Sequence, residues 1–353
     1  MICRDCSCMR KGWIKSRPEE AWCIGVKNPF RIEDVNQECT EYLDNDMNTI
    51  PTFGNVMNTA EDHFPPVLTI LVGIPGVGKS TYAMNKYNNG SNNVVWLSSD
   101  AFREKLYGDE SCQDNPGKVF EIMQQEAVDA LNKGYDVIYD ATNVTRKARA
   151  GILEKVPKFV RKECVICWAP LDIIYSRDAL RKRSVGPEVI EKMLRRFEAP
   201  FYDEGFDHIS VHVCDFYYNQ DQYYTNLISA MDIPHDNPHH TEGVLEHCRL
   251  CGTSIIGNGS PLLVQAGFLH DIGKPLTKTF KNRKGEDVDI AHYYDHQAVG
   301  AWLSYGIKGH NIALAWLIST HMAPFINLKY YNSLPPVYKN WIDILHKADK
   351  GAH

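Results

Sequence analysis

The most constraining feature of this sequence is an apolar run that leads straight into a glycine-rich loop. The run VLTILVG begins at Val67 and has the length of a buried strand. The loop that follows, GIPGVGKST, matches the pattern G-x-x-x-x-G-K-[ST] through Gly73, Gly78, Lys79 and Ser80. Because this pattern requires a strand before it and a helix after it, we expect a strand–loop–helix unit here.

The residue types in this loop suit phosphate binding. Glycines allow backbone N–H groups to face phosphate oxygens, and the dipole of the following helix favours negative charge. Lys79 is expected to neutralise the β- and γ-phosphates of ATP, and Ser80 is expected to hold Mg²⁺. The expected nucleotide contacts are Gly73, Gly76, Gly78, Lys79, Ser80 and Thr81. A glycine-rich turn without nucleotide is the alternative, since the pattern arises by chance in roughly one chain per hundred of this length.

Three further apolar runs alternate with helix-like stretches. They are NVVWLSSD, YDVIYDAT and CVICWAP. Between the first two, GKVFEIMQQEAVDALNKG has apolar residues at three- and four-residue steps. Alternating strands and helices predict a parallel sheet of the α/β class, in a domain over residues 67–225.

The stretch LSSDAFR has the chemistry that phosphoryl transfer requires. A kinase needs a base for the acceptor hydroxyl and cations for the migrating phosphoryl group. Asp100 is expected at the end of a strand, on the sheet edge where ligands bind, and Arg103 follows three residues later. Asp100 is therefore a candidate base, and a simple helix N-cap is the alternative.

The blocks GIPGVGKST, SSDAFR, YDATN and RDALRKR together resemble the bacteriophage polynucleotide 5′-kinase family over about residues 67–220. The resemblance implies that Asp100 takes the proton from a 5′-hydroxyl and that Arg103 contacts a 3′-phosphate of the acceptor. Asp140 and Asn143 stand in the third block, and their role is left open.

The fourth block implies an arginine-bearing lid over the donor phosphates. Arg177 and Arg181 are four residues apart and would share one helix face. They match the lid arginines of that family, with Arg183 as the competing choice because the register is not fixed. Solvated surface arginines are the other interpretation.

From about residue 226 the strand signals fade, and we expect an all-α domain over residues 226–353. Six ligand-type residues recur there about 23 to 28 residues apart: His247, His270 with Asp271, His296, His321 and Asp349. Imidazoles and carboxylates together bind divalent ions and leave positions open for water. Each element would lie on its own helix and converge on one site, and buried structural histidines are the alternative.

This order of residues, with the motif LHDIGKP, is similar to HD phosphohydrolases over about residues 235–353. The likeness is greatest to the HD domain attached to bacterial tRNA nucleotidyltransferases. The implied ligands of a first metal are His247, His270, Asp271 and Asp349. His296 and His321 would bind a second metal or the phosphate, and Lys274 would stabilise charge on the phosphoryl oxygens. The implied ion is a transition metal such as Mn²⁺ or Ni²⁺, one or two per site, and the histidines of PHDNPHH compete with His247.

Five of the eleven cysteines lie in the first thirty-nine residues. Four of them have the spacing C-x2-C-x16-C-x15-C: Cys3, Cys6, Cys23 and Cys39. A tetrahedral zinc site would fold a segment that is too small for its own core. Cys8 competes as a ligand, and an iron–sulfur site or reduced thiols are the alternatives. We therefore expect a small Cys-rich, candidate zinc-binding module over residues 1–45 and a polar linker over 46–66.

The cysteines of the later segments are interpreted as packing residues. Cys164 and Cys167 are three apart in a strand run, so they point to opposite faces of a buried strand. Cys248 and Cys251 are expected to pack on a helix.

Composition limits the function classes. A length of 353 residues suggests two or three domains, and 44% hydrophobic content is ordinary for a globular protein. No run of eighteen apolar residues and no signal-peptide core occurs, so we expect a cytoplasmic protein without a membrane partner. A formal net charge of −6 argues against non-specific coating of nucleic acid.

The fold class expected is an α/β P-loop kinase domain plus an all-α HD domain, and the pairing suggests one task. A kinase adds phosphate to 5′-hydroxyl ends, and a metal phosphohydrolase clears 2′,3′-cyclic or terminal phosphate at the opposite end. The combination predicts an end-healing enzyme for RNA or DNA ends, tRNA among them, that uses ATP and hands its product to a separate ligase. The alternatives are a nucleoside or nucleotide kinase fused to an HD nucleotidase, and a non-catalytic nucleotide-regulated binding protein.

Overall fold

The computed structural model describes residues 65–89, 93–112, 114–215, 217–238, 241–257 and 259–352, with the backbone of two short strands before them. The chain divides into two units, Met1–His63 and Phe64–His353. In the first unit, β1 (Trp22–Cys23) and β2 (Phe30–Arg31) pair antiparallel. Cys3, Cys6 and Cys39 lie outside the described residues, and only the backbone of Cys23 is described. The zinc-binding module and the linker over 46–66 stay predictions.

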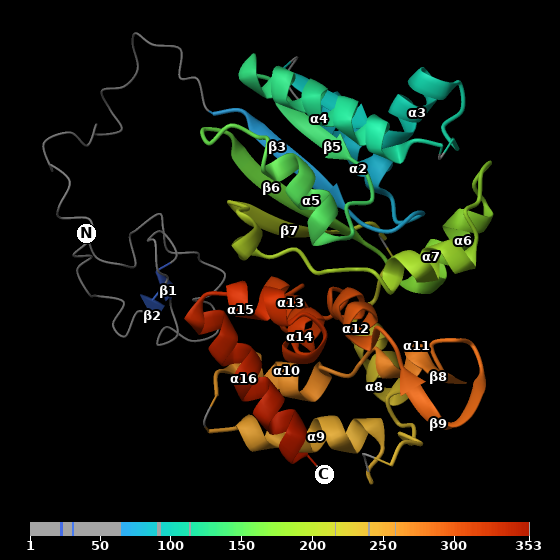
Figure 1. Cartoon of the computed structure of the whole chain (residues 1–353), viewed down its shortest axis with the longest axis vertical. Coiled ribbons are helices and arrows are strands. Elements are labelled where there is room, and N and C mark those ends of the chain that lie inside the picture. Colours follow the sequence, from blue (N-terminus) through green and yellow to red (C-terminus); the bar gives the residue numbers. More distant parts are fainter. Residues whose placement is uncertain are drawn as a thin grey trace, which may run out of the picture. The chain divides into compact units, whose positions relative to one another are not determined.

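A five-stranded parallel sheet begins the second unit and confirms the predicted α/β class (Figure 1). Its strands are β3 (Val67–Val72), β4 (Val94–Ser98), β5 (Asp136–Asp140), β6 (Arg161–Trp168) and β7 (His208–Val213). The order across the sheet is β4-β5-β3-β6-β7, with every neighbouring pair parallel. The central strand β3 therefore ends in the middle of the sheet edge, where its loop can receive a ligand.

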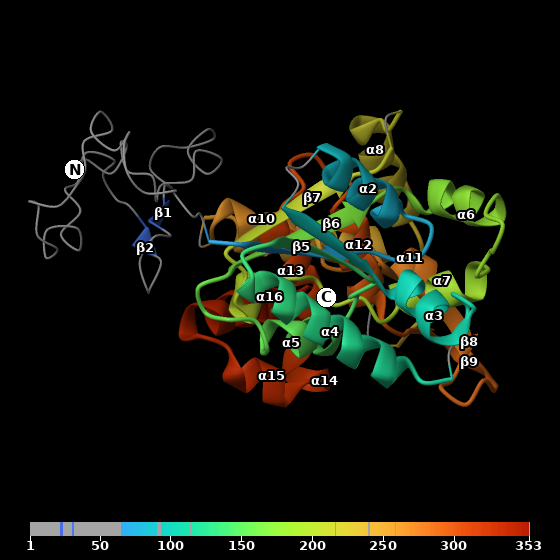
Figure 2. The same cartoon turned by 90° about the horizontal axis from the view of Figure 1, so that it is seen from above.

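Helices flank this sheet on both faces. They are α2 (Lys79–Asn89), α3 (Ser99–Tyr107), α4 (Pro116–Asn132), α5 (Arg146–Leu153), α6 (Leu171–Ala179) and α7 (Pro187–Leu194). Figures 1 and 2 show α2 on one face and α4 with α5 on the other. The buried residues of α4 recur at four-residue steps, Val119, Met123, Ala127 and Leu131, as the periodicity of its sequence predicts.

The remainder of the second unit is mainly helical. Its helices are α8 (Gln220–Ala230), α9 (Val244–Ile255), α10 (Pro261–Leu269), α11 (Lys274–Thr277), α12 (His296–Ser304), α13 (Ile312–Thr320), α14 (Ala323–Ile326), α15 (Leu328–Ser333) and α16 (Pro336–Gly351). The expected domain boundary at residue 225 falls within α8. None of the described helices is long and apolar enough to cross a bilayer.

An antiparallel hairpin departs from the expected all-α region. Its strands are β8 (Lys278–Lys281) and β9 (Asp287–Tyr293). Gly285, with φ of 85°, makes the turn, and its N–H donates to Asn282 O at 2.9 Å. Both strands are short and largely polar, so they lack the apolar run that reveals a buried strand.

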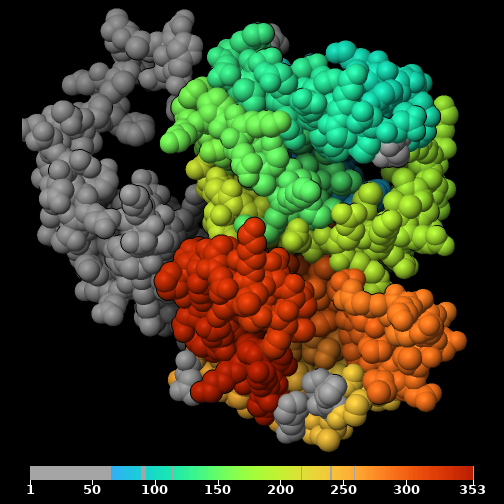
Figure 3. All heavy atoms as spheres, viewed as in Figure 1, coloured from blue at the N-terminus to red at the C-terminus, as the bar shows by residue number. Residues whose placement is uncertain are grey.

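The α/β and helical regions of the second unit share one continuous apolar core. Trp168, at the end of β6, donates its indole N–H to Trp302 O on α12 at 2.9 Å. The ring of Phe201 stacks on Trp316 of α13 with centroids 4.5 Å apart. Figure 3 shows the two regions in contact along one face, green against red and orange. The two regions are therefore packed as parts of one body.

Candidate active sites

The glycine-rich loop joins β3 to α2 in a conformation that its glycines permit. Gly76 and Gly78 have φ of 80° and 112°, in the left-handed region that side chains disfavour. At Gly73, an added Cβ would lie 2.8 Å from Cys167 O of the neighbouring strand. The loop therefore requires glycine both for its turn and for its close approach to β6.

Lys79 and Ser80 begin α2 directly behind this loop. Lys79 Nζ donates to Gly73 O at 2.8 Å and to Ile74 O at 3.1 Å. Ser80 Oγ donates to Asp140 Oδ2 at 3.0 Å, at the end of β5. A hydroxyl paired with a strand-end carboxylate is the usual Mg²⁺-holding arrangement of P-loop proteins. The structure thus brings Asp140, whose role the sequence left open, next to Ser80, and Thr81 is exposed on α2.

Lys79 and Asp140 perturb each other electrostatically. Burial lowers the pKa of Lys79, against the opposing carboxylates of Asp140 and Asp100. Burial raises the pKa of Asp140, against the opposing charge of Lys79 and the hydrogen bond from Ser80. These mutual effects place Lys79, Asp140 and Asp100 within electrostatic reach of one another at one edge of the sheet.

Asp100 and Arg103 lie in the first turns of α3, next to this edge. Arg103 Nη1 is 2.5 Å from Asp100 Oδ1. The Asp100 side chain is half exposed, and Ser98 occupies the N-cap position of α3, so the N-cap interpretation of Asp100 is not supported. Arg103 Nε is buried and has no hydrogen-bond partner within the described part of the chain.

The two predicted lid arginines do not share a helix face, because α6 ends at Ala179. Arg177 donates to Val77 O at 3.3 Å and to Cys214 O at 2.6 Å, so it ties the loop to the end of β7. Arg181 lies beyond the helix, half exposed and 3.8 Å from Asp178. Buried Asp178 accepts hydrogen bonds from Ser184, Val185 and Gly186 and so orders the segment after α6.

The six ligand-type residues of the helical region are brought together in one buried cluster. His247 lies on α9, His296 is the first residue of α12, and Asp349 is near the end of α16. His270 and His321 are the C-cap residues of α10 and α13. The expectation that the His270–Asp271 pair lies on a helix is corrected, since both residues occupy the turn between α10 and α11. A turn lets adjacent side chains point inward together.

The spacing of the ligand atoms in this cluster suits a divalent ion. His247 Nε2 is 2.9 Å from Asp349 Oδ1, and His270 Nε2 is 3.3 Å from the same oxygen. His296 Nε2 lies 3.2 Å from Asp271 Oδ1. Ligands held about 2.1 Å from one ion are roughly 3.0–3.4 Å apart, depending on geometry. Two sets without a common residue result, His247, His270 and Asp349, and Asp271, His296 and His321, and a third set of Cys248, His270 and Asp271 connects them.

All four histidines of the cluster are oriented by the backbone. Their Nδ1 atoms contact carbonyl oxygens of Ala352, Gly267, Tyr293 and Ile318, respectively, at 2.8–2.9 Å. A carbonyl only accepts, so each Nδ1 donates its proton there, and each Nε2 is left to face the other groups of the cluster. Metal-ligating histidines are held in this manner in proteins. His270 Nε2 is buried without a hydrogen bond of good geometry, although carboxylate oxygens lie close.

Asp271 stands between the two sets. Its Oδ1 faces His296, and its Oδ2 lies 3.2 Å from His270 Nε2 and 2.7 Å from Lys274 Nζ. Lys274 also contacts His235 Nε2 at 3.0 Å, and His235 Nδ1 contacts Glu242 O at 2.7 Å. His235 thus positions Lys274 rather than joining the cluster, a role that the sequence analysis missed by treating it as a rival of His247.

The cluster stabilises positive charge at its centre. Burial opposes the charged form of Asp271, but Lys274 and His270 outweigh it and hold its pKa well below the usual range. Burial also opposes imidazolium formation at His270, yet the Asp271 carboxylate holds its pKa well above the usual value. By contrast, burial and the neighbouring His296 lower the pKa of His321 to about 3. A cation would meet carboxylates in their charged form and at least one neutral imidazole.

A pocket of about 320 Å³ adjoins the segments that carry His296 and His321. Its lining includes Gln297 and Thr320, the chain neighbours of those two histidines, and Arg195 and Arg196 from the end of α7. Arg195 donates to Tyr294 O at 2.9 Å, just before α12. The side chain of Arg196 is exposed and makes no hydrogen bond or ion pair in the described part of the chain. The pocket therefore offers a free cation beside the cluster.

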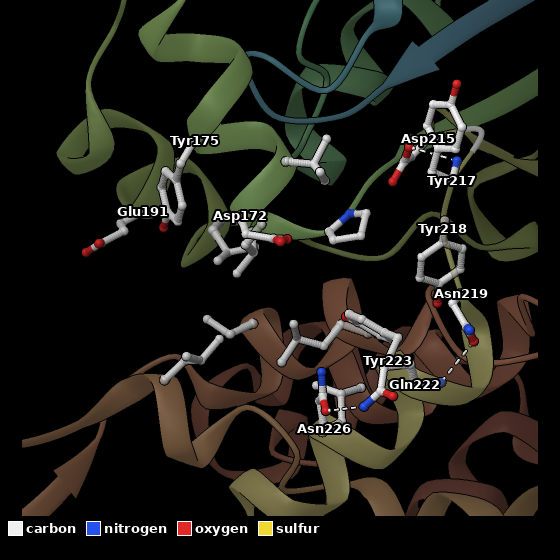
Figure 4. A pocket seen from close by; sticks show the side chains of 18 of the residues that line it. Asp172, Tyr175, Glu191, Asp215, Tyr217, Tyr218, Asn219, Gln222, Tyr223 and Asn226 are labelled. Carbon is white, nitrogen blue, oxygen red and sulfur yellow. Dashed lines mark hydrogen bonds between the residues drawn. The ribbon is translucent and has the colours of Figure 1, made fainter.

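A larger pocket, of about 680 Å³, lies where α6 and α7 face α8 (Figure 4). Asp172, Tyr175 and Glu191 line one wall, and Tyr223 lines the opposite wall. None of the sequence-predicted site residues is among the described residues that line it. Its carboxylates disfavour phosphate, although Arg195 lines both this pocket and the smaller one.

Comparisons with known proteins concern the α/β region. A family model described as an AAA domain matches residues 68–200. The L-seryl-tRNA(Sec) kinase of Methanococcus maripaludis is 29% identical over 149 residues, which cover 38% of this chain and 53% of that protein. This chain thus spans about half the length of the curated relative that it matches.

Solved structures also match part of this chain. The Pnkp1/Rnl/Hen1 RNA repair complex is 25% identical over 39% of this chain and 44% of that chain, with a TM-score of 0.34. A fungal RNA kinase is 15% identical over 46% of this chain and 80% of that chain, with a TM-score of 0.32. The five-stranded parallel sheet, its flanking helices and the range matched by the AAA domain model together fit an α/β P-loop kinase domain.

Proposed function

We propose that this protein is a bifunctional end-healing enzyme that phosphorylates 5′-hydroxyl ends of RNA and removes 2′,3′-cyclic or terminal phosphate with a bound metal. The observation that carries the proposal is the gathering of six imidazole and carboxylate groups in the same compact unit as a P-loop. One set of residues suits phosphate transfer from ATP, and the other suits metal-assisted phosphate hydrolysis.

In the kinase half, Lys79 and the loop amides bind the ATP phosphates. Ser80 and Asp140, paired at 3.0 Å, hold Mg²⁺. Asp100 accepts the proton of the attacking hydroxyl, and the unpartnered Nε of Arg103 is available to a phosphate of the acceptor. Arg177 supports the loop, and Arg181, half exposed and 3.8 Å from Asp178, is the arginine assigned to the donor phosphates. The name of the curated relative, a kinase that acts on a seryl-tRNA, agrees with a nucleic-acid acceptor.

In the hydrolase half, the cluster is that of an HD phosphohydrolase. We assign His247, His270 and Asp349 to one ion and His296 with His321 to a second, with Asp271 shared between them. A transition metal such as Mn²⁺ or Ni²⁺ supplies Lewis-acid activation of phosphate and water when bound. Lys274 stays paired with Asp271 and adds positive charge for the phosphoryl oxygens.

A polynucleotide substrate is favoured over a free nucleoside by the charge next to the cluster. Arg195 and Arg196 line a pocket beside the ligand histidines, and such cations attract a phosphate backbone. The product, with a 5′-phosphate and a free 3′ end, is the substrate that a separate ligase requires. RNA rather than DNA is the choice that fits a 2′,3′-cyclic phosphate, since only RNA carries the 2′-hydroxyl.

The kinase half is tested with a 5′-hydroxyl oligonucleotide, labelled ATP and Mg²⁺. Label transfer is expected, and it should be lost in Asp100→Ala. Transfer that persists in that variant rejects the assigned base, and no transfer by the wild type rejects the kinase half. Competition by free nucleosides at equal concentration identifies the small-molecule alternative.

The hydrolase half is tested with an RNA that ends in a 2′,3′-cyclic phosphate, in the presence of Mn²⁺ or Ni²⁺. The double variant His270→Ala with Asp271→Ala should leave the end closed while label transfer to 5′-hydroxyl ends continues. If that variant still opens and clears the end, the cluster is not the active site. Failure of the wild type on both this RNA and a generic phosphatase substrate favours a non-catalytic binding protein.

A further inference from the structure

Two cysteines and a histidine share one face of the sheet beside the nucleotide loop. Cys167 of β6 pairs in register with His212 of β7, and Cys214 follows two residues later. The backbone N–H of Cys214 donates to Trp168 O at 2.7 Å, which continues the pairing beyond β7. Because alternate residues of a strand point to the same face, all three side chains lie on one side. It is the side of α2, whose Tyr82 ring lies 4.8 Å from that of His212.

Both cysteines touch the loop itself. An added Cβ at Gly78 would lie 3.4 Å from Cys214 Sγ and 3.2 Å from its Cβ. At the other end of the loop, Gly73 approaches the backbone and Cβ of Cys167. Arg177 joins the carbonyl of Cys214 to the carbonyl of Val77 within the loop. A displacement of Cys214 is therefore transmitted to the segment that binds phosphate.

The two thiols differ in the ways that a nucleophile and its resolving partner differ. Cys214 is partly exposed, whereas Cys167 is buried, and Cys214 Sγ lies 3.6 Å from His212 O. The neighbouring Cys167 thiol, with His212 and Arg177, lowers the pKa of Cys214 to about 5. The Cys214 thiol and burial raise the pKa of Cys167. At neutral pH, Cys214 is the thiolate that reacts with an oxidant.

We propose that Cys214 and Cys167 form a peroxide-sensitive dithiol that closes into a disulfide beside the nucleotide loop and stops nucleotide binding. The Cys214 thiolate attacks one oxygen of hydrogen peroxide, the O–O bond breaks, and a sulfenic acid and hydroxide result. The thiol of Cys167 then attacks that sulfur, the S–O bond breaks, and its proton leaves with the oxygen as water. Two sulfurs lose two electrons in total, and peroxide gains them.

Sheet geometry explains why the bond would close the nucleotide site. In a parallel pair, strands about 4.8 Å apart that rise about 3.3 Å per residue place residues offset by two positions about 8 Å apart at Cα. A disulfide requires about 4.4–6.8 Å between its Cα atoms. Closing the bond must therefore shift Cys214 out of the position in which it contacts Gly78 and Arg177. The loop then loses its contact with Cys214 and the support of Arg177.

The test uses the full chain treated with hydrogen peroxide, with binding of a fluorescent ATP analogue measured before and after. Wild type should lose at least tenfold in affinity and recover with dithiothreitol, and tryptic peptides should show a Cys167–Cys214 cross-link. Cys214→Ser and Cys167→Ser should each change less than twofold on treatment, relative to their own untreated affinity. Cys112→Ser, which removes a partly exposed cysteine elsewhere, should respond as the wild type does.

The peptide map separates this inference from the nucleotide site. If peroxide weakens binding while the peptide map shows a cross-link between other cysteines, or no cross-link, the dithiol is overturned. A Cys167–Cys214 cross-link that leaves affinity unchanged overturns the switch. An untreated protein that never binds the analogue refutes the nucleotide site, and with it the switch, while the cross-link alone still reports on the dithiol.

Discussion

His296 and His321 face each other across the cluster with their Nε2 atoms 3.2 Å apart, while each Nδ1 is held by a backbone carbonyl. With both Nδ1 protons donated to carbonyls, the two Nε2 atoms face each other, and either a proton on one of them or a cation between them would satisfy both lone pairs. The proposed metal-binding function uses the cation, with His296, His321 and Asp271 as its ligands.

Metal should therefore stabilise the folded protein. At a Mn²⁺ concentration about a hundredfold above Kd, the free energy of unfolding should rise by about 2.7 kcal/mol. Because one kcal/mol shifts Tm by about 2–4 °C in a protein of this class, a rise of several degrees is expected in a thermal melt. His321→Ala should abolish the rise, and His292→Ala, on the hairpin, should retain it. Equal Tm values with Mn²⁺ and with chelator would contradict the ligand set.

Arg196→Gln should weaken the use of RNA ends without damaging the metal cluster. Arg196 is exposed in the pocket beside the cluster, and its loss removes one phosphate contact. We expect a higher KM for a cyclic-phosphate RNA, a reduced salt dependence of binding, and an unchanged rate on a small phosphatase substrate. Arg249→Gln, an exposed arginine paired with Glu246 on α9, is the matched control. If the rates on both substrates fall equally, Arg196 supports the fold of the site and does not bind RNA.

Asp100→Asn should slow phosphate transfer by about 10²–10⁴-fold, the usual contribution of a general base. The loss should appear in kcat, because the loop that binds ATP is untouched, and it is measured by label transfer to a 5′-hydroxyl oligonucleotide. Asp109→Asn changes a carboxylate just after the same helix and should be nearly silent. A change confined to the KM for ATP would assign Asp100 to nucleotide binding instead.

Cys214 should react with iodoacetamide at a rate that is nearly independent of pH above about 6. The thiolate is the reactive form, and a pKa of about 5 means that it already predominates at neutral pH. The rate should fall as pH drops through 5, whereas an ordinary thiol, with a pKa of about 8.5, gains reactivity up to pH 9. Peptide mass spectrometry of the alkylated protein follows Cys214 directly. A rate that climbs tenfold per unit from pH 6 to 8 would rule out the lowered pKa.

Arg149→Met should destabilise the folded protein by about 3–5 kcal/mol. Arg149 is fully buried, and its guanidinium makes two hydrogen bonds to Glu204, at 2.7 and 2.8 Å. The substitution removes the main partner of the buried Glu204 carboxylate, which keeps only Arg146 at 3.4 Å and the Phe201 N–H. Arg161→Met, which breaks a half-exposed pair with Glu163, should cost less than about 1 kcal/mol in the same urea titration. Similar losses in the two variants would contradict this distinction.

The sequence predicted the elements whose signals are local. The run before Gly73 became β3 because five apolar residues out of six need burial on both faces of a parallel sheet. The residues of the cluster were selected because metal binding would restrict the residue types to imidazole and carboxylate. Their convergence depends on helix packing, which spacing alone does not specify.

The residues that the sequence missed act through tertiary contacts. Asn143 is buried and donates to Leu71 O at 2.8 Å, so its block supports the backbone of β3. The pairing of Asp140 with Ser80 depends on the packing of β5 beside β3, which the sequence around Asp140 does not specify. The expectation that Arg177 and Arg181 share a helix face was wrong because α6 ends at Ala179. The carboxylate of Asp178 accepts hydrogen bonds from the backbone N–H groups of Val185 and Gly186 in the segment after the helix. The periodicity of the sequence does not predict this helix end.

The hydrogen bond from Trp168 to Trp302 couples the stability of the α/β region to that of the helical region. The two indoles are buried in the interface between the two halves. Unfolding of either half there would therefore expose apolar surface of the other. Heat, or a substitution that disrupts this packing in one half, would then loosen the other half as well.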